Sequence, residues 1–239
     1  ITFEVEQGPL TEVGEVSISG NTAFSSDELF AQLPDLKGTS YSRAKFRNSV
    51  RKLAEFYSKE GYYNARISYA ITEPPADPKA EKQLVKLEFK VENEDRKVVI
   101  NRILVAGNED TKQSAILKAS PLRPGEFLRS GDVYSTEQNL YATDAFDRVE
   151  VKPVSAGNTP NGDHLSDVII NVNEQPPRLI TYGGGFSTDL GVNGFFDIRH
   201  VNLLGNLWQG GARIRVSQRQ QLVQFDFINP RFIPDGEKK

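Results

Sequence analysis

The sequence predicts two α+β units of order β-α-α-β-β, followed by antiparallel strands of the kind that begin a transmembrane β-barrel. Three observations support this prediction. A Gly-Asn pair ends a strand-like segment at Gly20 and again at Gly107, 87 residues later. Apolar residues at helical spacing follow each pair. Residues 178–232 then alternate between apolar and polar with the period of two that strands have.

The composition limits what kind of protein this can be. The 239 residues are 38% hydrophobic and 26% charged, with a formal net charge of -3. No stretch reaches the roughly 18 apolar residues of a membrane helix, so any membrane part must consist of strands. The balanced charge does not indicate a nucleic-acid partner. Because cysteine is absent, disulfides and thiolate chemistry are excluded.

The first unit begins with a strand at 13–19. Gly20-Asn21 ends this strand in a sharp turn, because both residue types tolerate positive φ. Ser25 and Glu28 form a capping-box pattern that starts a short helix. A longer helix spans about 42–59, and one of its faces carries Phe46, Val50, Leu53 and Tyr57.

Gly61 ends this longer helix, and a strand follows at 65–72. A Pro-rich loop at 73–83 separates that strand from a final strand that contains 87–93. The offset of 87 residues also maps Gly38 onto Gly125 and Leu53 onto Leu140. The same order of elements is therefore expected in the second unit.

The second unit is predicted to have a first strand at 99–106, which the Gly107-Asn108 turn ends. Thr111 is the expected N-cap of a short helix that carries Ile116 and Leu117. A longer helix begins near Ser130. The remaining expected features are a helix face with Val133, Leu140 and Tyr141, a strand at 147–154, a loop at 155–164 and a last strand at 168–174.

These elements define the expected domains, which are 9–94 and 95–175 for the two units and 176–239 for the strand-rich region. Residues 1–8 match the end of the last strand in each unit, so we expect them to close a preceding unit. The chain has no initiator Met and no signal peptide, so we expect it to be an internal part of a longer protein, with an incomplete set of barrel strands. Gln175-Pro176-Pro177 is expected to be a stiff, extended linker.

The strand-rich region has one apolar and one polar face. The apolar positions are Ile180, Tyr182, Phe186, Val192, Gly194, Phe196, Ile198, Trp208, Ala212, Ile214, Val216, Val223, Phe225 and Phe227. Tight turns are expected at 188–191 and 204–206. Strands of about ten residues and arginines on the polar face favour a membrane barrel with a wet lumen. A soluble β-domain also alternates, so the pattern alone leaves both interpretations open.

Taken together, these residues carry a family resemblance. Tandem β-α-α-β-β units with Gly-Asn after the first strand resemble polypeptide-transport-associated (POTRA) domains. The segment 182–189, the residues Asn202-Leu203-Leu204-Gly205 and the segment 227–232 resemble the opening strands of the bacterial surface-antigen barrel. The whole chain is thus similar to the Omp85 superfamily of outer-membrane assembly factors.

The resemblance implies an insertase in the outer membrane of a Gram-negative cell, with POTRA domains in the periplasm. Its implied partners are unfolded outer-membrane proteins or a secreted polypeptide, accessory lipoproteins or an inner-membrane partner, and outer-membrane lipid. No cofactor, metal or nucleic acid is implied. The sequence does not separate a general insertase from its translocation-and-assembly relative, from a two-partner secretion pore that exports one polypeptide, or from a soluble scaffold.

The resemblance also implies a mechanism in which an extended client strand adds to an exposed sheet edge. The candidate edge residues are Arg66, Ile67, Ser68, Tyr69, Ala70, Ile71, Arg148, Val149, Glu150 and Val151. The alternative is that the side chains of Ile67, Tyr69 and Ile71 simply pack beneath the helices. Since strand addition uses the backbone, both interpretations can hold at once.

A glycine run marks the first strand of the strand-rich region, which forms the barrel seam in the family. The candidate seam residues are Ile180, Tyr182, Gly183, Gly184, Gly185 and Phe186. Three glycines weaken strand pairing, which would let the seam open laterally. The alternative is a barrel kink where neighbouring side chains crowd the strand.

Two other features have weaker functional interpretations. The basic residues Arg43, Arg47, Arg51, Lys45, Lys52 and Lys59 on the first long helix suit anionic lipid or an acidic partner, or are simply solvated. His164 and His200 have no further ligand at metal-binding spacing. No nucleophile elbow or phosphate loop is present, so we expect that the protein is not an enzyme.

Overall fold

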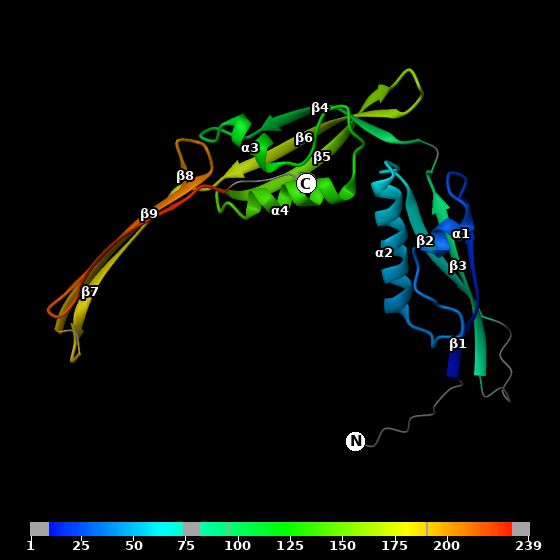
Figure 1. Ribbon diagram of the computed structural model, residues 1–239, viewed down its shortest axis with the longest axis horizontal. Helices are drawn as coiled ribbons and strands as arrows, with labels where there is room; N and C mark the ends of the chain where they lie inside the picture. The colour runs from blue at the N-terminus through cyan, green and yellow to red at the C-terminus, as the bar shows by residue number, and fades with distance from the viewer. Residues whose placement is uncertain (1–9, 74–81, 95, 190, 231–239) are drawn as a thin grey trace, which may run out of the picture. The chain divides into compact units, whose positions relative to one another are not determined.

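The computed structural model describes residues 10–73, 82–94, 96–189 and 191–230. The strand predicted at 1–8 and the motif residues after Pro230 lie outside these ranges. The elements follow in the order β1 (Leu10–Ser19), α1 (Ser26–Phe30), α2 (Arg43–Lys59), β2 (Arg66–Thr72), β3 (Lys82–Glu92), β4 (Val98–Ala106), α3 (Gln113–Ala119), α4 (Ser130–Tyr141), β5 (Phe146–Asn158), β6 (His164–Glu174), β7 (Arg178–Ser187), β8 (Gly191–Leu203), β9 (Trp208–Ser217) and β10 (Gln221–Ile228) (Figure 1).

The chain forms two compact units. One runs to Val98 and includes Phe127–Gly131 and Asn158–His164, and the other comprises Val99–Glu126, Asp132–Gly157 and the residues from Leu165 onward. We refer to β1 through β3 as the first repeat, to β4 through β6 as the second repeat, and to β7 through β10 as the C-terminal sheet.

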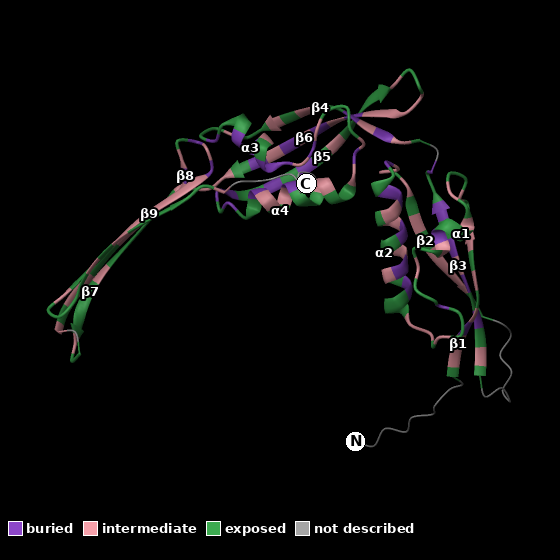
Figure 2. Ribbon diagram, viewed as in Figure 1, coloured by how far each residue is buried: buried purple, intermediate pink, exposed green. Residues whose placement is uncertain are grey.

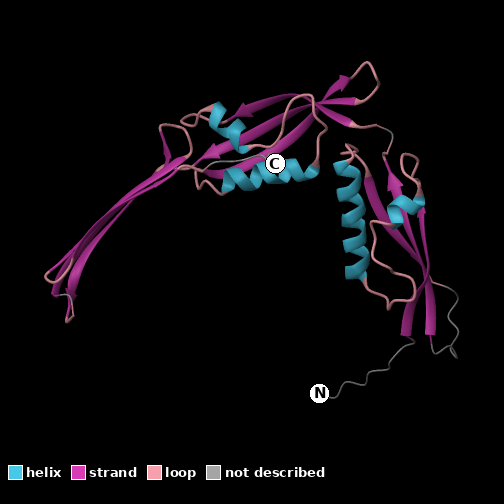
Figure 3. Cartoon of the chain, viewed as in Figure 1, coloured by secondary structure: helices cyan, strands magenta, loops and turns pink. Residues whose placement is uncertain are grey.

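The first repeat is a three-stranded sheet of order β1-β3-β2, in which β1 runs parallel and β2 antiparallel to the central β3. Figure 3 shows α2 beside this sheet. Phe46, Leu53 and Tyr57 of α2 are fully buried in the core, while Val50 packs against its margin. Each such burial contributes about 1.5–3 kcal/mol, so the predicted helix face accounts for much of this core.

The predicted helix starts in the first repeat are confirmed. Ser25 accepts a hydrogen bond from the Glu28 N–H, and the Glu28 carboxylate accepts one from the Ser25 N–H, which completes the capping box. The Ser42 hydroxyl caps α2 by accepting from the Lys45 N–H. At the other end, Gly61 adopts φ +95 after the last turn of α2.

The second repeat has the same order of elements and the corresponding sheet order, β4-β6-β5. Two details of the prediction are wrong. Thr111 does not cap α3, whose N-cap is Lys112 without a side-chain hydrogen bond, because the Thr111 hydroxyl is used in another contact. The loop predicted at 155–164 is shorter, because β5 continues to Asn158 and β6 begins at His164.

The C-terminal sheet has four antiparallel strands in the order β10-β9-β8-β7. The predicted alternation is confirmed by its register, since Tyr182 lies opposite Phe196, Phe196 opposite Ile214, and Ile214 opposite Val223. The polar face carries Asp197 opposite Arg213, joined by an ion pair of 2.9 Å. Figure 2 shows that this sheet consists mostly of exposed and half-buried residues. Within the described residues, the outer edges of β7 and β10 are unpaired.

The Gly-Asn turns after β1 and β4 have matching geometry. Gly20 has φ +80 and Gly107 has φ +83, a region that other residues rarely adopt. A Cβ atom on Gly107 would overlap the carbonyl oxygen of Val172, just as one on Gly20 would overlap that of Val91. In both turns the next Asn donates from Nδ2 to a backbone carbonyl three residues on, at 2.9 Å.

We predict that Gly107→Ala destabilises the protein by about 2–4 kcal/mol, because the new methyl group meets backbone oxygen in addition to the strain of positive φ. Gly125→Ala is the matched control, since Gly125 has φ +85 but no atom within 4 Å of the added Cβ. The control is expected to cost only about 1 kcal/mol. Equal losses of stability in thermal unfolding would show that the close approach to Val172 is unimportant.

Candidate functional site

The strand predicted as the first candidate edge, β2, lies at the outside of its sheet, and in the described part of the chain its one partner strand is β3. Ile67, Tyr69 and Ile71 pack against the core of the first repeat. Arg66 and Ser68 are exposed, and Ala70 is half-buried. Among the described residues, no side chain hydrogen-bonds to the β2 backbone. The side chains of Ile67, Tyr69 and Ile71 therefore belong to the core, while no described residue covers the outer backbone edge of β2.

The second candidate edge, on β5, also lies at the outside of its sheet but is occupied by side chains. Val149 and Val151 are buried, whereas Arg148 and Glu150 are exposed. The Tyr141 hydroxyl accepts from the Val149 N–H at 3.0 Å and donates to the Val149 carbonyl at 3.3 Å. The Glu137 carboxylate accepts from the Val151 N–H at 3.0 Å.

The opposite edges of both sheets are partly covered by backbone segments. Val13 of β1 accepts from the Gly38 N–H at 2.7 Å and donates to Thr39 at 2.9 Å. Ile100 of β4 accepts from the Gly125 N–H at 2.7 Å and donates to Glu126 at 2.9 Å. The two repeats thus close these edges in the same way, 87 positions apart.

A carboxylate fixes the loop after each Gly-Asn pair. The buried Glu94 accepts from the Thr22 N–H, from the Thr22 hydroxyl at 2.9 Å and from the Tyr57 hydroxyl at 2.5 Å. Burial, and then the hydrogen bond to Glu94, raise the pKa of Tyr57. Tyr57 therefore remains a neutral hydrogen-bond donor at physiological pH.

In the second repeat Glu174 has the corresponding role. Its carboxylate accepts from the backbone N–H groups of Asp110 and Thr111, each at 2.8 Å. Burial of Glu174 acts to raise its pKa, but the hydrogen bonds from Thr111 and Asp110 prevail, and its pKa is lowered. The charged carboxylate is thus the form that the folded loop binds.

The loop after β4 also contacts the end of β8 and the turn that follows it. Asn202, which is buried, donates from Nδ2 to the Thr111 hydroxyl at 2.8 Å and accepts from the Leu207 N–H at 3.0 Å. The Lys112 N–H donates to the Gly205 carbonyl at 2.9 Å. This contact explains why Thr111 does not cap α3.

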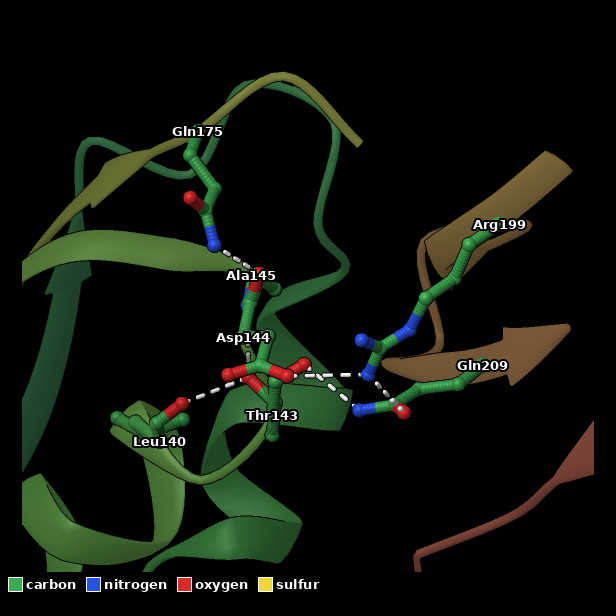
Figure 4. A network of polar contacts seen from close by, with 7 residues as sticks. All are labelled: Leu140, Thr143, Asp144, Ala145, Gln175, Arg199 and Gln209. Atoms are coloured by element: carbon green, nitrogen blue, oxygen red, sulfur yellow. Dashed lines mark hydrogen bonds and ion pairs between the residues drawn. The ribbon is translucent and has the colours of Figure 1, made fainter. Parts of the chain in front are cut away.

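A second polar contact joins the end of α4 to the C-terminal sheet. Figure 4 shows Arg199 and Gln209 pointing toward Thr143 and Asp144. Arg199 pairs with Asp144 at 3.0 Å and donates to Gln209 at 3.0 Å, and Gln209 donates to the Thr143 carbonyl at 2.9 Å. The Gln175 side chain donates to the Asp144 carbonyl, and the Gln175 backbone N–H donates to the Ala145 carbonyl at 3.1 Å. The predicted linker is therefore held by hydrogen bonds at its first residue.

The glycine run lies within β7, but its members differ in their surroundings. A Cβ on Gly183 would meet the ring of Phe195 on the neighbouring strand, whereas Gly185 has nothing within 4 Å. The absence of a side chain at Gly183 thus has a local packing reason. This is the crowding by neighbouring side chains that the sequence analysis gave as the alternative to a weak seam. The remaining candidate seam residues, Ile180, Tyr182 and Phe186, have exposed side chains.

The other candidate groups remain separate from one another. The basic residues of α2 are exposed, and Arg51 pairs with Glu55 on the same helix. His164 contacts Asn158, and His200 accepts from the Asn202 N–H. Within the part of the chain that the structure describes, no group of three His, Asp or Glu residues could hold a metal ion. None of the described helices is both long and apolar enough to cross a membrane.

The sequence analysis did not identify the polar side chains that hydrogen-bond to backbone groups of loops and edge strands. Glu94 and Glu174 carried a usable signal, because each lies in an acidic or amide cluster at the end of the last strand of its repeat. Tyr141 was assigned to the helix face that packs on the core, and Glu137 was not identified. No local pattern distinguishes a helical side chain that reaches a strand edge from one that is solvated.

The comparisons with known proteins agree on one family. The sequence model for POTRA, described as surface antigen variable number repeat, matches residues 11–94 and 98–175. The chain is 24% identical to the outer membrane protein assembly factor BamA of Nitratidesulfovibrio vulgaris, covering 99% of this chain and 29% of that protein. It is 29% identical to a putative outer membrane protein assembly factor of Treponema pallidum, covering 98% and 27%. The chain thus spans less than a third of these relatives.

Solved structures show the same fold. The crystal structure of BamA from Haemophilus ducreyi lacking POTRA domains 1-3 matches with a TM-score of 0.76 at 22% identity, covering 94% of this chain and 41% of that chain. POTRA3-5 of Haemophilus influenzae BamA matches with a TM-score of 0.55 at 17% identity, covering 69% and 61%. The resemblance to POTRA repeats of Omp85 assembly factors is confirmed.

We predict that Glu174→Gln lowers the stability of the protein in a pH-dependent way. Because the pKa of Glu174 is lowered from 4.5, its contribution is complete above that value and is lost as the pH falls through the folded-state pKa. At neutral pH the variant should lose about 1 kcal/mol, or about 2–4 °C in melting temperature. At about pH 3 the wild type and the variant should melt closer together.

The control for this experiment is Glu150→Gln, which removes an exposed carboxylate from β5. It should change the melting temperature little at either pH. If the loss caused by Glu174→Gln were the same at both values, the carboxylate charge would have no part in holding the loop.

Proposed function

Because the chain belongs to the POTRA family of surface antigen variable number repeats, we propose that it is part of an outer-membrane protein assembly factor. The observation that carries the proposal is the continuous match to proteins named as such factors, which includes 98–99% of this chain. The match therefore takes in both repeats and the C-terminal sheet. On this proposal the repeats lie in the periplasm of a Gram-negative cell.

The repeats bind unfolded outer-membrane proteins by strand addition. An edge strand offers N–H and C=O groups to any extended peptide, so recognition does not depend on the client sequence. The candidate acceptors are Arg66–Ile71 of β2 and Arg148–Val151 of β5. The open backbone edge of β2 supports the first of these directly. Transfer needs no nucleotide, because hydrogen bonding and burial of the client in the bilayer supply the driving force.

The C-terminal sheet provides the first strands of the membrane barrel that receives the client. Its apolar face is exposed, with Tyr182 and Phe225 each 78% accessible. Such a face is typical of lipid contact, and Arg213 and Asp197 on the opposite face suit a wet lumen. The 94% coverage by the Haemophilus ducreyi structure includes most of this sheet and supports the same assignment.

β7 is the proposed seam of this barrel. Its outer edge is unpaired in the described sheet, and its three consecutive glycines reduce the side-chain contacts that would stabilise pairing. Gly185 has no neighbour in the space a side chain would fill, so packing does not explain it. A weak seam would allow a client strand to enter laterally.

The proposal is tested by photocrosslinking in cells with probes at Ser68 of β2 and Ile180 of β7, both exposed. We expect capture of many different unfolded outer-membrane proteins at both positions. A probe at Arg47, exposed on α2, is the matched control and should capture few. Capture of one secreted polypeptide would instead identify a dedicated exporter. The absence of any client at Ser68 and Ile180 would overturn the proposal.

A further inference from the structure

The outer edge of β5 carries three hydrogen bonds that a neighbouring strand would otherwise make. Tyr141 and Glu137 of α4 contact alternate residues of the strand, Val149 and Val151. Since alternate residues direct their backbone groups to the same edge, these side chains occupy one continuous stretch of it. We call Tyr141 and Glu137 the edge latch.

The first repeat lacks this latch. The offset that maps Leu53 onto Leu140 also maps Val50 onto Glu137 and Ala54 onto Tyr141. Valine and alanine have no side-chain hydrogen-bonding atoms. This agrees with the β2 backbone, which receives no side-chain hydrogen bond from the described residues. The two repeats therefore differ at the edge although they share sheet order and turn geometry.

We propose that the edge latch closes β5 to client strands, so that strand addition takes place at β2 and not at β5. The inference rests on the function proposed above and makes it specific to one edge. An added peptide must first displace both side chains from β5, whereas at the β2 edge there is no described side chain to displace. Displacement of the edge latch breaks its three hydrogen bonds to β5. If these have ordinary strength, peptide binding at β5 is weakened on the order of 100-fold.

The latch itself is tested without any client. In Tyr141→Phe/Glu137→Val, both hydrogen-bonding groups are removed while the aromatic ring of residue 141 is kept. Tyr141 is 45% exposed, so the change leaves the core intact. We expect the exchange protection of the Val149 and Val151 amides to fall by about tenfold, the effect of losing one hydrogen bond at each. Unchanged protection would overturn the latch, whatever the client experiments show.

Edge selection is tested by photocrosslinking on the full chain in detergent. The probe positions are Ser68 on β2 and Glu150 on β5, both exposed. The peptide has about ten alternating apolar and polar residues, the length of a barrel strand. In the wild-type chain, crosslinking is expected at Ser68 and to be far weaker at Glu150. In the unlatched double variant, crosslinking at Glu150 should rise toward that at Ser68.

The reciprocal variant transfers the latch to the first repeat. Val50→Glu/Ala54→Tyr should reduce crosslinking at Ser68 if its folded state is retained, which thermal unfolding checks because Val50 packs against the core. Equal crosslinking at Ser68 and Glu150 in the wild type, or no increase at Glu150 after unlatching, would overturn edge selection. No crosslinking at Ser68 in the wild type would instead reject the proposed strand addition to β2, and the exchange experiment would still decide whether the latch exists.

Discussion

In the described part of the chain, each three-stranded sheet has one central strand, β3 or β6, that pairs with a strand on both sides. The other two strands of each sheet have an outer edge, and the structure is organised around these edges. Unpaired N–H and C=O groups must be satisfied by water, by the chain or by a partner. In both repeats the segment before the long helix hydrogen-bonds to the first strand, as with Gly38 on β1 and Gly125 on β4. The strand after the long helix, β2 or β5, is therefore the edge strand whose hydrogen-bond partners differ between the repeats.

The two repeats show that the hydrogen bonding of this edge strand can differ while the fold stays the same. Tight Gly-Asn turns, a carboxylate that holds the following loop, and backbone cover on the first strand recur in both. At the β2 and β5 edges the repeats diverge, because the long helix presents apolar side chains in one and a tyrosine and a glutamate in the other. Two residues can therefore change how a sheet edge is exposed without altering any element of the topology.

Much of this architecture could be predicted from the sequence because it depends on local or periodic signals. The spacing of Phe46, Leu53 and Tyr57 defines one helix face, and the alternation through β7 to β10 defines two sheet faces. The failures involve polar side chains with a choice of partners. Thr111 has the chemistry of an N-cap, but its hydroxyl contacts Asn202, which is 91 residues away. The role of Tyr141 depends equally on tertiary placement, which no spacing reveals.

The number of backbone groups on an edge strand limits how tightly a POTRA repeat could bind a client. β2 has 7 residues, and only alternate residues direct their backbone groups outward. At a net value of about 1 kcal/mol for each hydrogen bond, such an edge supplies only a few kcal/mol before the cost of ordering the peptide. On the proposed function, a single edge would therefore bind a client weakly and reversibly. Such binding would suit transfer, because a longer strand pairing elsewhere would compete successfully for the client.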